Sequence, residues 1–182
     1  MKVVLTGALA AASAFAPAAA FAVDYLSVAE ASLLLFPDAD RFDARTIDLD
    51  AAQLQSLDGR GVRARSARWQ ALAARRGDAT LGYVVADQVV GKFELIGYAV
   101  GIGLDGAVRQ VEILSYRESH GGEIRLAAWR RQFAGKTTDS PLRVGEDIAN
   151  ISGATLSCAH VTDGVRRIVA VVALARRAGA LA

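Results

Sequence analysis

The sequence is poor in the residues that form disulfides and metal sites. It has one cysteine, Cys158, and two histidines, His120 and His160, among 182 residues. A single cysteine cannot form an intrachain disulfide, and it cannot complete a C-x-x-C-H haem site or a cysteine-rich zinc site. Cys158 and His160 form a C-x-H pair, which we interpret as a buried cysteine and a polar histidine on one helix. The sequence therefore predicts no metal centre.

An excess of charge of one sign is also missing. The 21 basic and 19 acidic residues leave a formal net charge of +2, and no basic cluster is long enough to indicate nucleic-acid binding. Tandem repeats and Pro- or Gly-rich linkers are absent as well, and 53% of the residues are hydrophobic. This composition is typical of a globular domain with its own core, and it predicts no nucleic-acid partner.

The one long apolar run lies at the N-terminus. Lys2 supplies a positive charge, residues 3–19 are apolar and rich in Ala, and Ala20-Phe21-Ala22 ends the run. This pattern predicts a signal peptide over residues 1–22 and a mature chain in the periplasm or another extracytoplasmic space. The alternative is an uncleaved anchor, which makes the protein membrane-associated. The later apolar run, 168–175, is far shorter than the roughly 20 residues that span a bilayer.

Periodicity predicts short elements in the first part of the chain. Leu26, Leu33 and Phe36 share one face of a helix over 26–36 that Pro37 ends. Residues 42–49 alternate as a strand does, and Asp50 can cap a helix over 51–57. The segment 60–76, rich in Ala and Arg, gives no clear pattern.

The centre and the end of the chain predict an α+β domain. Strands over 79–86, 93–103 and 107–116 form a small antiparallel sheet, a meander, packed by helices on one side. A helix is expected over 123–133, followed by an irregular stretch over 135–151. The last helix begins near Thr155 and ends near Arg177. Its apolar stripe comprises Val161, Val165, Ile168, Val169, Val172 and Ala173.

The segment that enters this last helix is the best candidate for a ligand site. The first turn of a helix has free N–H groups and the positive end of the helix dipole, which favour a phosphate. Gly153 and Ala154 allow close approach, and Thr155 offers a hydroxyl that can be esterified. The same residues also suit an ordinary helix start with Ser152 or Thr155 as N-cap, so the residues alone leave both readings open.

The run Ser152-Gly153-Ala154-Thr155, followed by Ser157, resembles the flavinylation motif of the FMN-binding domain family. That family includes extracytoplasmic subunits of the Rnf and Na⁺-translocating NADH:quinone oxidoreductase complexes. The resemblance implies that Thr155 carries FMN through a phosphoester bond installed by a flavin transferase. Upstream, Glu118-Ser119-His120-Gly121-Gly122 is similar to the family's E-x-x-G-G loop, and Gln132-Phe133-Ala134-Gly135-Lys136 to its Q-F-x-G-K segment.

The resemblance covers residues 79–177. It implies an FMN-binding domain over 79–182, preceded by the signal peptide and by an N-terminal helical and mixed extension over 23–78. Glu118 and His120 are expected to line the flavin, although a solvated turn would look the same. Lys136, with Arg143, is expected to balance the phosphate unless it is a surface cation. The full expected set is Thr155, Ser152, Gly153, Ala154, Leu156, Ser157, Glu118, His120, Gly121, Gly122 and Lys136, with no catalytic residue.

One position departs from the family pattern. The family usually has Asp three residues before the Ser, where this chain has Ala149, and Asp147 is the nearest acid that could replace it. The function implied is an exported flavoprotein that passes electrons between membrane-bound or periplasmic partners. One alternative is a periplasmic module that binds flavin or another phosphate ligand without redox turnover. A hydrolase using His120 and Asp147 is the other, but no nucleophile elbow is present.

Overall fold

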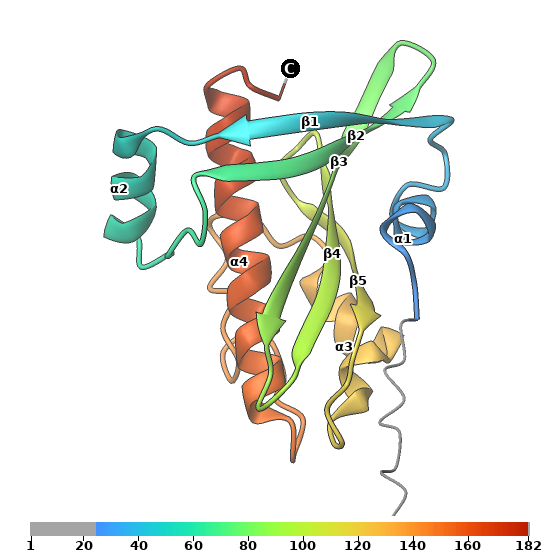
Figure 1. Cartoon of the computed structure of the whole chain (residues 1–182), viewed down its shortest axis with the longest axis vertical. Coiled ribbons are helices and arrows are strands. Elements are labelled where there is room, and N and C mark those ends of the chain that lie inside the picture. Colours follow the sequence, from blue (N-terminus) through green and yellow to red (C-terminus); the bar gives the residue numbers. More distant parts are fainter. Residues whose placement is uncertain (1–24, 182) are drawn as a thin grey trace, which may run out of the picture.

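A computed structural model describes residues 25–181 as a five-stranded antiparallel sheet with helices on both faces (Figure 1). Each strand pairs with the next along the chain. The strands are β1 (Arg41–Asp48), β2 (Arg68–Arg76), β3 (Ala79–Val90), β4 (Leu95–Gly103) and β5 (Val108–Ser115). The predicted α+β class and meander are confirmed. The predicted signal peptide lies outside the described residues, and no helix within 25–181 has the length and apolarity to cross a membrane.

The sheet is larger than the sequence predicted, because β2 runs through the segment that gave no clear pattern. Trp69, Ala71 and Ala73 are buried and alternate with more exposed residues along β2. Arg68 forms an ion pair with Asp48 across the β1–β2 ladder, with 2.6 Å between nitrogen and oxygen. Three of the buried side chains on β2 are alanines, so the apolar half of the alternation is weak in the sequence.

The longest helix, α4 (Thr155–Arg177), lies along one face of the sheet (Figure 1). Its predicted bounds are confirmed, and its buried side chains pack with those of β3 to β5 in the main core. Gly164 lets the helix approach closely, since a Cβ there would lie 2.0 Å from Tyr98 Oη. The Tyr98 hydroxyl donates to Asp87, which also pairs with Arg167 at 3.2 Å. Burial raises the pKa of Tyr98, so this hydroxyl stays protonated.

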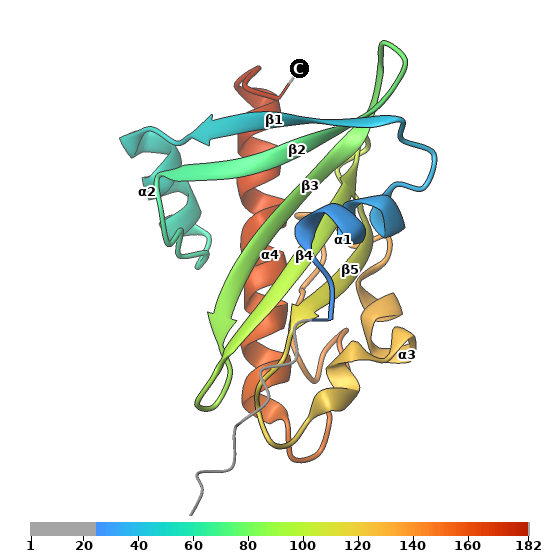
Figure 2. The ribbon, with the colours of Figure 1, turned by 45° about the vertical axis from the view of Figure 1, so that its right-hand side comes forward.

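The opposite face of the sheet is covered by α1 (Val28–Leu35), as Figure 2 shows. A capping box formed by Ser27 and Glu30 begins this helix. Leu35 and Phe36 pack on β3 and β4, where a Cβ at Gly101 would lie 3.1 Å from Leu35 Cβ. The expectation of helices on one side only is therefore wrong. The sheet has a second, smaller apolar face that α1 closes.

The remaining helices are short. Helix α2 (Ala51–Gly59) begins at the predicted cap, Asp50. The single helix expected over 123–133 is instead η1 (Gly122–Arg125), α3 (Ala127–Arg130) and η2 (Arg131–Phe133), because Leu126 is extended. Tertiary contacts favour the break: Trp129 Nε1 donates to the Ala149 carbonyl at 2.8 Å, and Arg130 donates to the Val111 carbonyl at 2.8 Å.

Candidate functional site

The loop that enters α4 presents a hydroxyl and free backbone donors at one place. Ala154 is the N-cap residue and gives no side-chain cap. Among residues 25–181, no acceptor takes the N–H groups of Thr155, Leu156 and Ser157. The Thr155 hydroxyl is exposed and accepts a hydrogen bond from Asn150 Nδ2 at 3.1 Å. This helix start therefore has the donors and the positive dipole end that suit a phosphate.

The glycine loop after β5 packs directly on this helix start. Gly121 has φ +86°, and a Cβ added there would lie 2.2 Å from Ala154 Cβ and 2.7 Å from Tyr116 Oη. The Tyr116 hydroxyl donates to the His120 carbonyl and lies 3.3 Å from Ser157 Oγ. Burial raises the pKa of Tyr116, which keeps this donor protonated. Tyr116 thus joins the glycine loop to the first turn of α4.

Glu118 fixes the same loop to the turn between β3 and β4. Its Oε1 accepts hydrogen bonds from three successive N–H groups, those of Lys92, Phe93 at 2.7 Å and Glu94 at 3.0 Å. Partial burial alone would raise the pKa of Glu118. These three donors, with the charge of Lys92, outweigh that effect and hold the pKa below its usual range. Glu118 is therefore ionised, and its carboxylate holds the glycine loop and the β3–β4 turn together.

Two adjoining hollows lie around these loops. The first, of about 260 Å³, is lined by Lys92, Phe93, Glu118, Ser119, His120 and residues 153–157. The second, of about 520 Å³, shares residues 118–120 and adds Tyr25, Tyr116, Gly121, Gly122, Glu123, Arg125 and Leu126. Sizes of this order are typical of small-molecule sites, which span about 300–1,000 Å³. The Thr155 hydroxyl therefore opens onto a space in which a ligand of this size can lie.

The structure brings most of the predicted site residues together. Those that line one or both hollows are Glu118, His120, Gly121, Gly122, Gly153, Ala154, Thr155, Leu156 and Ser157. Ser152 lies in the turn just before them and lines neither. Gly122 has room, because a Cβ there would stand 3.7 Å from Arg125, whereas the tight position is Gly121. The close contact of this loop with α4 is therefore made by Gly121.

Lys136 is not brought to this site. Its carbonyl accepts from Val108 N at the start of β5, whereas the glycine loop follows the other end of that strand. Its Nζ pairs with Asp147 at 2.8 Å. Asp147 also accepts from the N–H groups of Leu142 and Arg143. Burial alone would raise the pKa of Asp147, but Lys136 and these donors hold it low, so the Asp147 carboxylate is engaged within this loop.

Three residues around the site were missed by sequence reasoning. Lys92 and Phe93 line the first hollow from the β3–β4 turn, and Tyr116 bridges the glycine loop to α4. Phe93 was read as the start of a strand, whereas β4 begins at Leu95. The glycine of the Gly-Lys-Phe-Glu run was the available signal for a turn, which places Phe93 at the tip of the hairpin.

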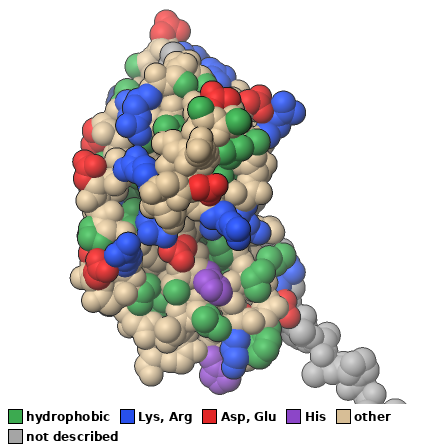
Figure 3. Space-filling model, turned by 90° about the vertical axis from the view of Figure 1, so that its left-hand side faces the viewer, with side chains coloured by type: hydrophobic (Ala, Val, Ile, Leu, Met, Phe, Trp, Pro, Cys, Tyr) green, Lys and Arg blue, Asp and Glu red, His purple; other side chains and the backbone are tan. Residues whose placement is uncertain are grey.

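The C-x-H pair has the arrangement that we expected. Cys158 is fully buried, and burial raises the pKa of its thiol. His160 is half-buried, and its Nδ1 donates to the Val90 carbonyl at 2.5 Å. Within residues 25–181 no group of three His, Cys, Asp or Glu side chains is placed to hold a metal ion. On the face that Figure 3 shows, histidine side chains appear among hydrophobic ones in the lower half.

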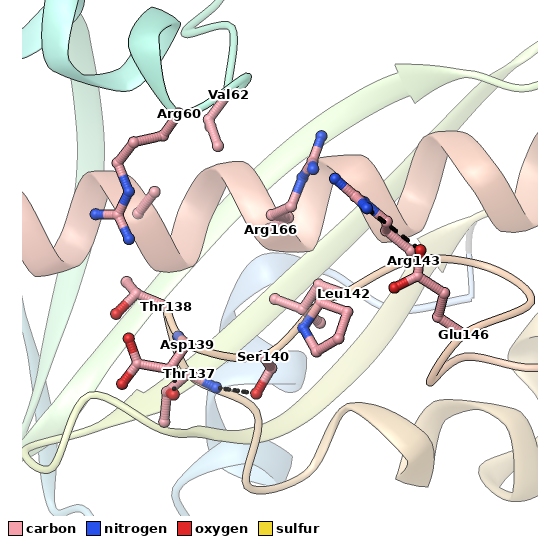
Figure 4. Close-up of a pocket in the computed structure, with 12 residues that line it drawn as sticks. Arg60, Val62, Thr137, Thr138, Asp139, Ser140, Leu142, Arg143, Glu146 and Arg166 are labelled. Carbon is pink, nitrogen blue, oxygen red and sulfur yellow. Dashed lines mark hydrogen bonds and ion pairs between the residues drawn. The ribbon is translucent and has the colours of Figure 1, made fainter.

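A separate pocket of about 370 Å³ lies between the loop 137–146, the turn after α2 and the side of α4 (Figure 4). Arg60, Arg143 and Arg166 are its basic residues. Arg143 pairs with Glu146 at 3.2 Å, and Arg166 pairs with Asp163 at 3.2 Å. These pairs offset most of the positive charge, and of the residues expected around the flavin Arg143 alone lines this pocket. The site beside Thr155 is therefore the better candidate.

Comparison with known proteins gives a family match for the part of the chain that holds this site. Residues 91–170 match the family model described as the FMN-binding domain. The matched region begins at the β3–β4 turn and contains the glycine loop and the first turns of α4. A search of curated proteins gives no match.

Proposed function

Residues 91–170 belong to the FMN-binding domain family, and on that premise we propose that the chain is an exported flavoprotein with FMN bound covalently to Thr155. The observation that carries the proposal is the exposed Thr155 hydroxyl at a helix start with free N–H groups, beside the hollows formed with the glycine loop. We further propose that the bound flavin passes electrons between membrane-bound or periplasmic partners.

The residues of the site fit the parts of FMN. The N–H groups of Thr155, Leu156 and Ser157 can donate to the phosphate, and the helix dipole favours its negative charge there. The hollow beside Phe93 and the glycine loop can take the ring. When bound, FMN supplies one- or two-electron redox chemistry, while the chain holds it and shields it from water.

The attachment needs an activated flavin donor. Joining FMN itself to a hydroxyl requires loss of water, which is unfavourable in aqueous solution. A flavin dinucleotide avoids this, because the Thr155 oxygen attacks the flavin-side phosphorus and the pyrophosphate bond breaks. The hydroxyl proton goes to a base, the nucleoside monophosphate departs, and the flavin transferase catalyses the transfer.

Mass spectrometry tests the attachment. The protein should be made with a periplasmic flavin transferase and denatured, so that loosely bound flavin is lost. We expect an added mass of about 438 Da on the peptide that contains Thr155, one FMN less one water. Thr155→Ala should remove it, whereas Thr138→Ala, a hydroxyl lost outside the site, should not. A colourless wild-type protein would refute the proposal, and flavin retained in Thr155→Ala would place the bond elsewhere.

The alternative is a module that holds flavin or another phosphate ligand without redox turnover. The free donors at the start of α4 suit any phosphate, which is the observation in its favour. Reduction of the attached flavin by host membranes supplied with a respiratory donor separates the two functions. Rapid bleaching of the flavin band supports electron transfer, and a flavin that stays oxidised supports the binding module.

A further inference from the structure

The tip of the β3–β4 hairpin, residues 91–95, carries two side chains that the proposed attachment does not use. Phe93 is 75% exposed, the highest value among the exposed large apolar side chains of residues 25–181. Phe93 and Lys92 line the same hollow as Thr155. Lys92 Nζ lies 4.8 Å from the centre of the Phe93 ring. An aromatic ring and an ammonium group therefore stand together at the wall of the site.

The backbone of the hairpin tip is held firmly although these side chains are exposed. Glu118 takes the N–H groups of Lys92, Phe93 and Glu94. Gly91 N donates to the Glu94 carbonyl at 2.8 Å, which closes the turn, and His160 holds the Val90 carbonyl from α4. Because the backbone is held from two sides, the hairpin tip loses little backbone conformational entropy when its side chains bind a ligand.

We propose that the hairpin tip is the platform for the flavin ring, with Phe93 packed on one face of the isoalloxazine and Lys92 beside its edge. This inference rests on the proposed attachment at Thr155, which brings the ring to this hollow. Flat aromatic systems favour offset stacking, and the contact would remove the Phe93 ring from water. Leu156, 46% exposed on the first turn of α4, lines the same hollow and adds apolar surface.

Lys92 should also affect the midpoint potential of the bound flavin. Uptake of two electrons and one proton leaves the reduced flavin with one negative charge on its pyrimidine ring. An ammonium group nearby stabilises that form more than the neutral oxidised form, and the effect is stronger where water is partly excluded. Lys92 should therefore raise the midpoint potential of the bound flavin, with the electrons supplied by dithionite in a titration.

The test uses FMN-loaded protein, and Leu95→Ala is the matched control. Leu95 is 45% exposed on the same hairpin and does not line the hollow. Phe93→Ala should raise iodide quenching of flavin fluorescence about twofold, because a second ring face opens to solvent. Phe93→Leu should restore part of the protection. Lys92→Gln should shift the midpoint potential to more negative values without a comparable change in quenching, and Lys92→Arg should reverse that shift.

Unchanged quenching in loaded Phe93→Ala, or a change of equal size in Leu95→Ala, would overturn the platform while leaving the attachment intact. Free FMN added to Thr155→Ala tests the platform without the covalent bond. Its dissociation constant should rise severalfold when Phe93→Ala is added and stay unchanged when Leu95→Ala is added. Failure of the attachment at Thr155 and failure of the platform are thus separate results.

Discussion

Gly121→Ala tests the contact that joins the glycine loop to α4. The added Cβ would lie 2.2 Å from Ala154 Cβ and 2.7 Å from Tyr116 Oη, so the loop or the helix start must move. Overpacking of this kind costs about 1–3 kcal/mol. The left-handed φ of +86° adds about 1–2 kcal/mol for any residue with a side chain. We therefore expect the free energy of unfolding to fall by about 2–5 kcal/mol.

Two other glycines separate the cost of the steric contact from the cost of the left-handed backbone. Gly153 has φ +81° with no atom within 4 Å of an added Cβ, so Gly153→Ala should show the backbone cost alone. Gly122 lacks a left-handed φ and has only ordinary contact, so Gly122→Ala should be close to neutral. Urea denaturation of the flavin-free protein measures all three variants. Because the closest contact is with Ala154 Cβ, the double variant Gly121→Ala/Ala154→Gly should recover part of the loss.

Equal destabilisation by Gly121→Ala and Gly153→Ala would refute the contact, since both share the backbone strain. If the contact is real, Gly121→Ala should also lower the yield of attached flavin, because it moves the loop away from the first turn of α4. Yield per folded protein, taken from the ratio of flavin to protein absorbance, separates this effect from loss of folded material.

Three further changes test the fold and the site. Val169→Asp places a carboxylate at a position that is 2% exposed, so it should lower the free energy of unfolding by about 4 kcal/mol or more, and an unchanged melting temperature would contradict the packing of α4. Glu118→Gln should destabilise the protein at neutral pH. Because folding lowers the pKa of Glu118, the stabilisation it gives is present above its unfolded pKa and is lost as pH falls through the folded value. Denaturation curves of the two proteins should therefore converge in acid, and a constant gap would show that ionisation is irrelevant. Ala149→Asp should raise the yield of attached flavin, because Ala149 is exposed and only its backbone is engaged, and an unchanged yield would show that the transferase does not need this acid.

Strong local signals decided which elements could be predicted. Asp50 caps α2 as expected, and α4 begins and ends where its stripe and flanking residues indicate. Strand β2 was missed because alanines carry much of its buried face. The prediction of a single helix over 123–133 was wrong because Trp129 and Arg130 donate hydrogen bonds to distant backbone carbonyls. The positions of these carbonyls cannot be predicted from the local sequence. The local sequence pattern was enough to predict an element that packs through its own apolar stripe. It was not enough where contacts with residues distant in the sequence determine the geometry of the element.

The site divides in the same way. Residues that share one chain segment, such as Gly153 to Ser157, could be predicted together from the motif. The hydrogen bonds from the backbone of the β3–β4 turn to Glu118 depend on the register of β3, β4 and β5. That register cannot be read from the sequence alone. Lys136 was expected at the flavin because its segment resembles the family, yet its carbonyl bonds at the opposite end of β5. Spacing along the chain indicates which residues are candidates, and strand register decides which of them meet.

The position of Thr155 on the first turn of α4 limits how a bound flavin can travel. This helix has 23 residues and packs along the sheet, and the loop before it is joined to the glycine loop through Tyr116 and Gly121. Within residues 25–181 this attachment point is part of the packed helix itself, so no separate arm of protein carries the group between donor and acceptor. Electron transfer would then depend on whole-molecule encounters, so diffusion and surface complementarity with each partner, rather than an internal swinging motion, would set the rate.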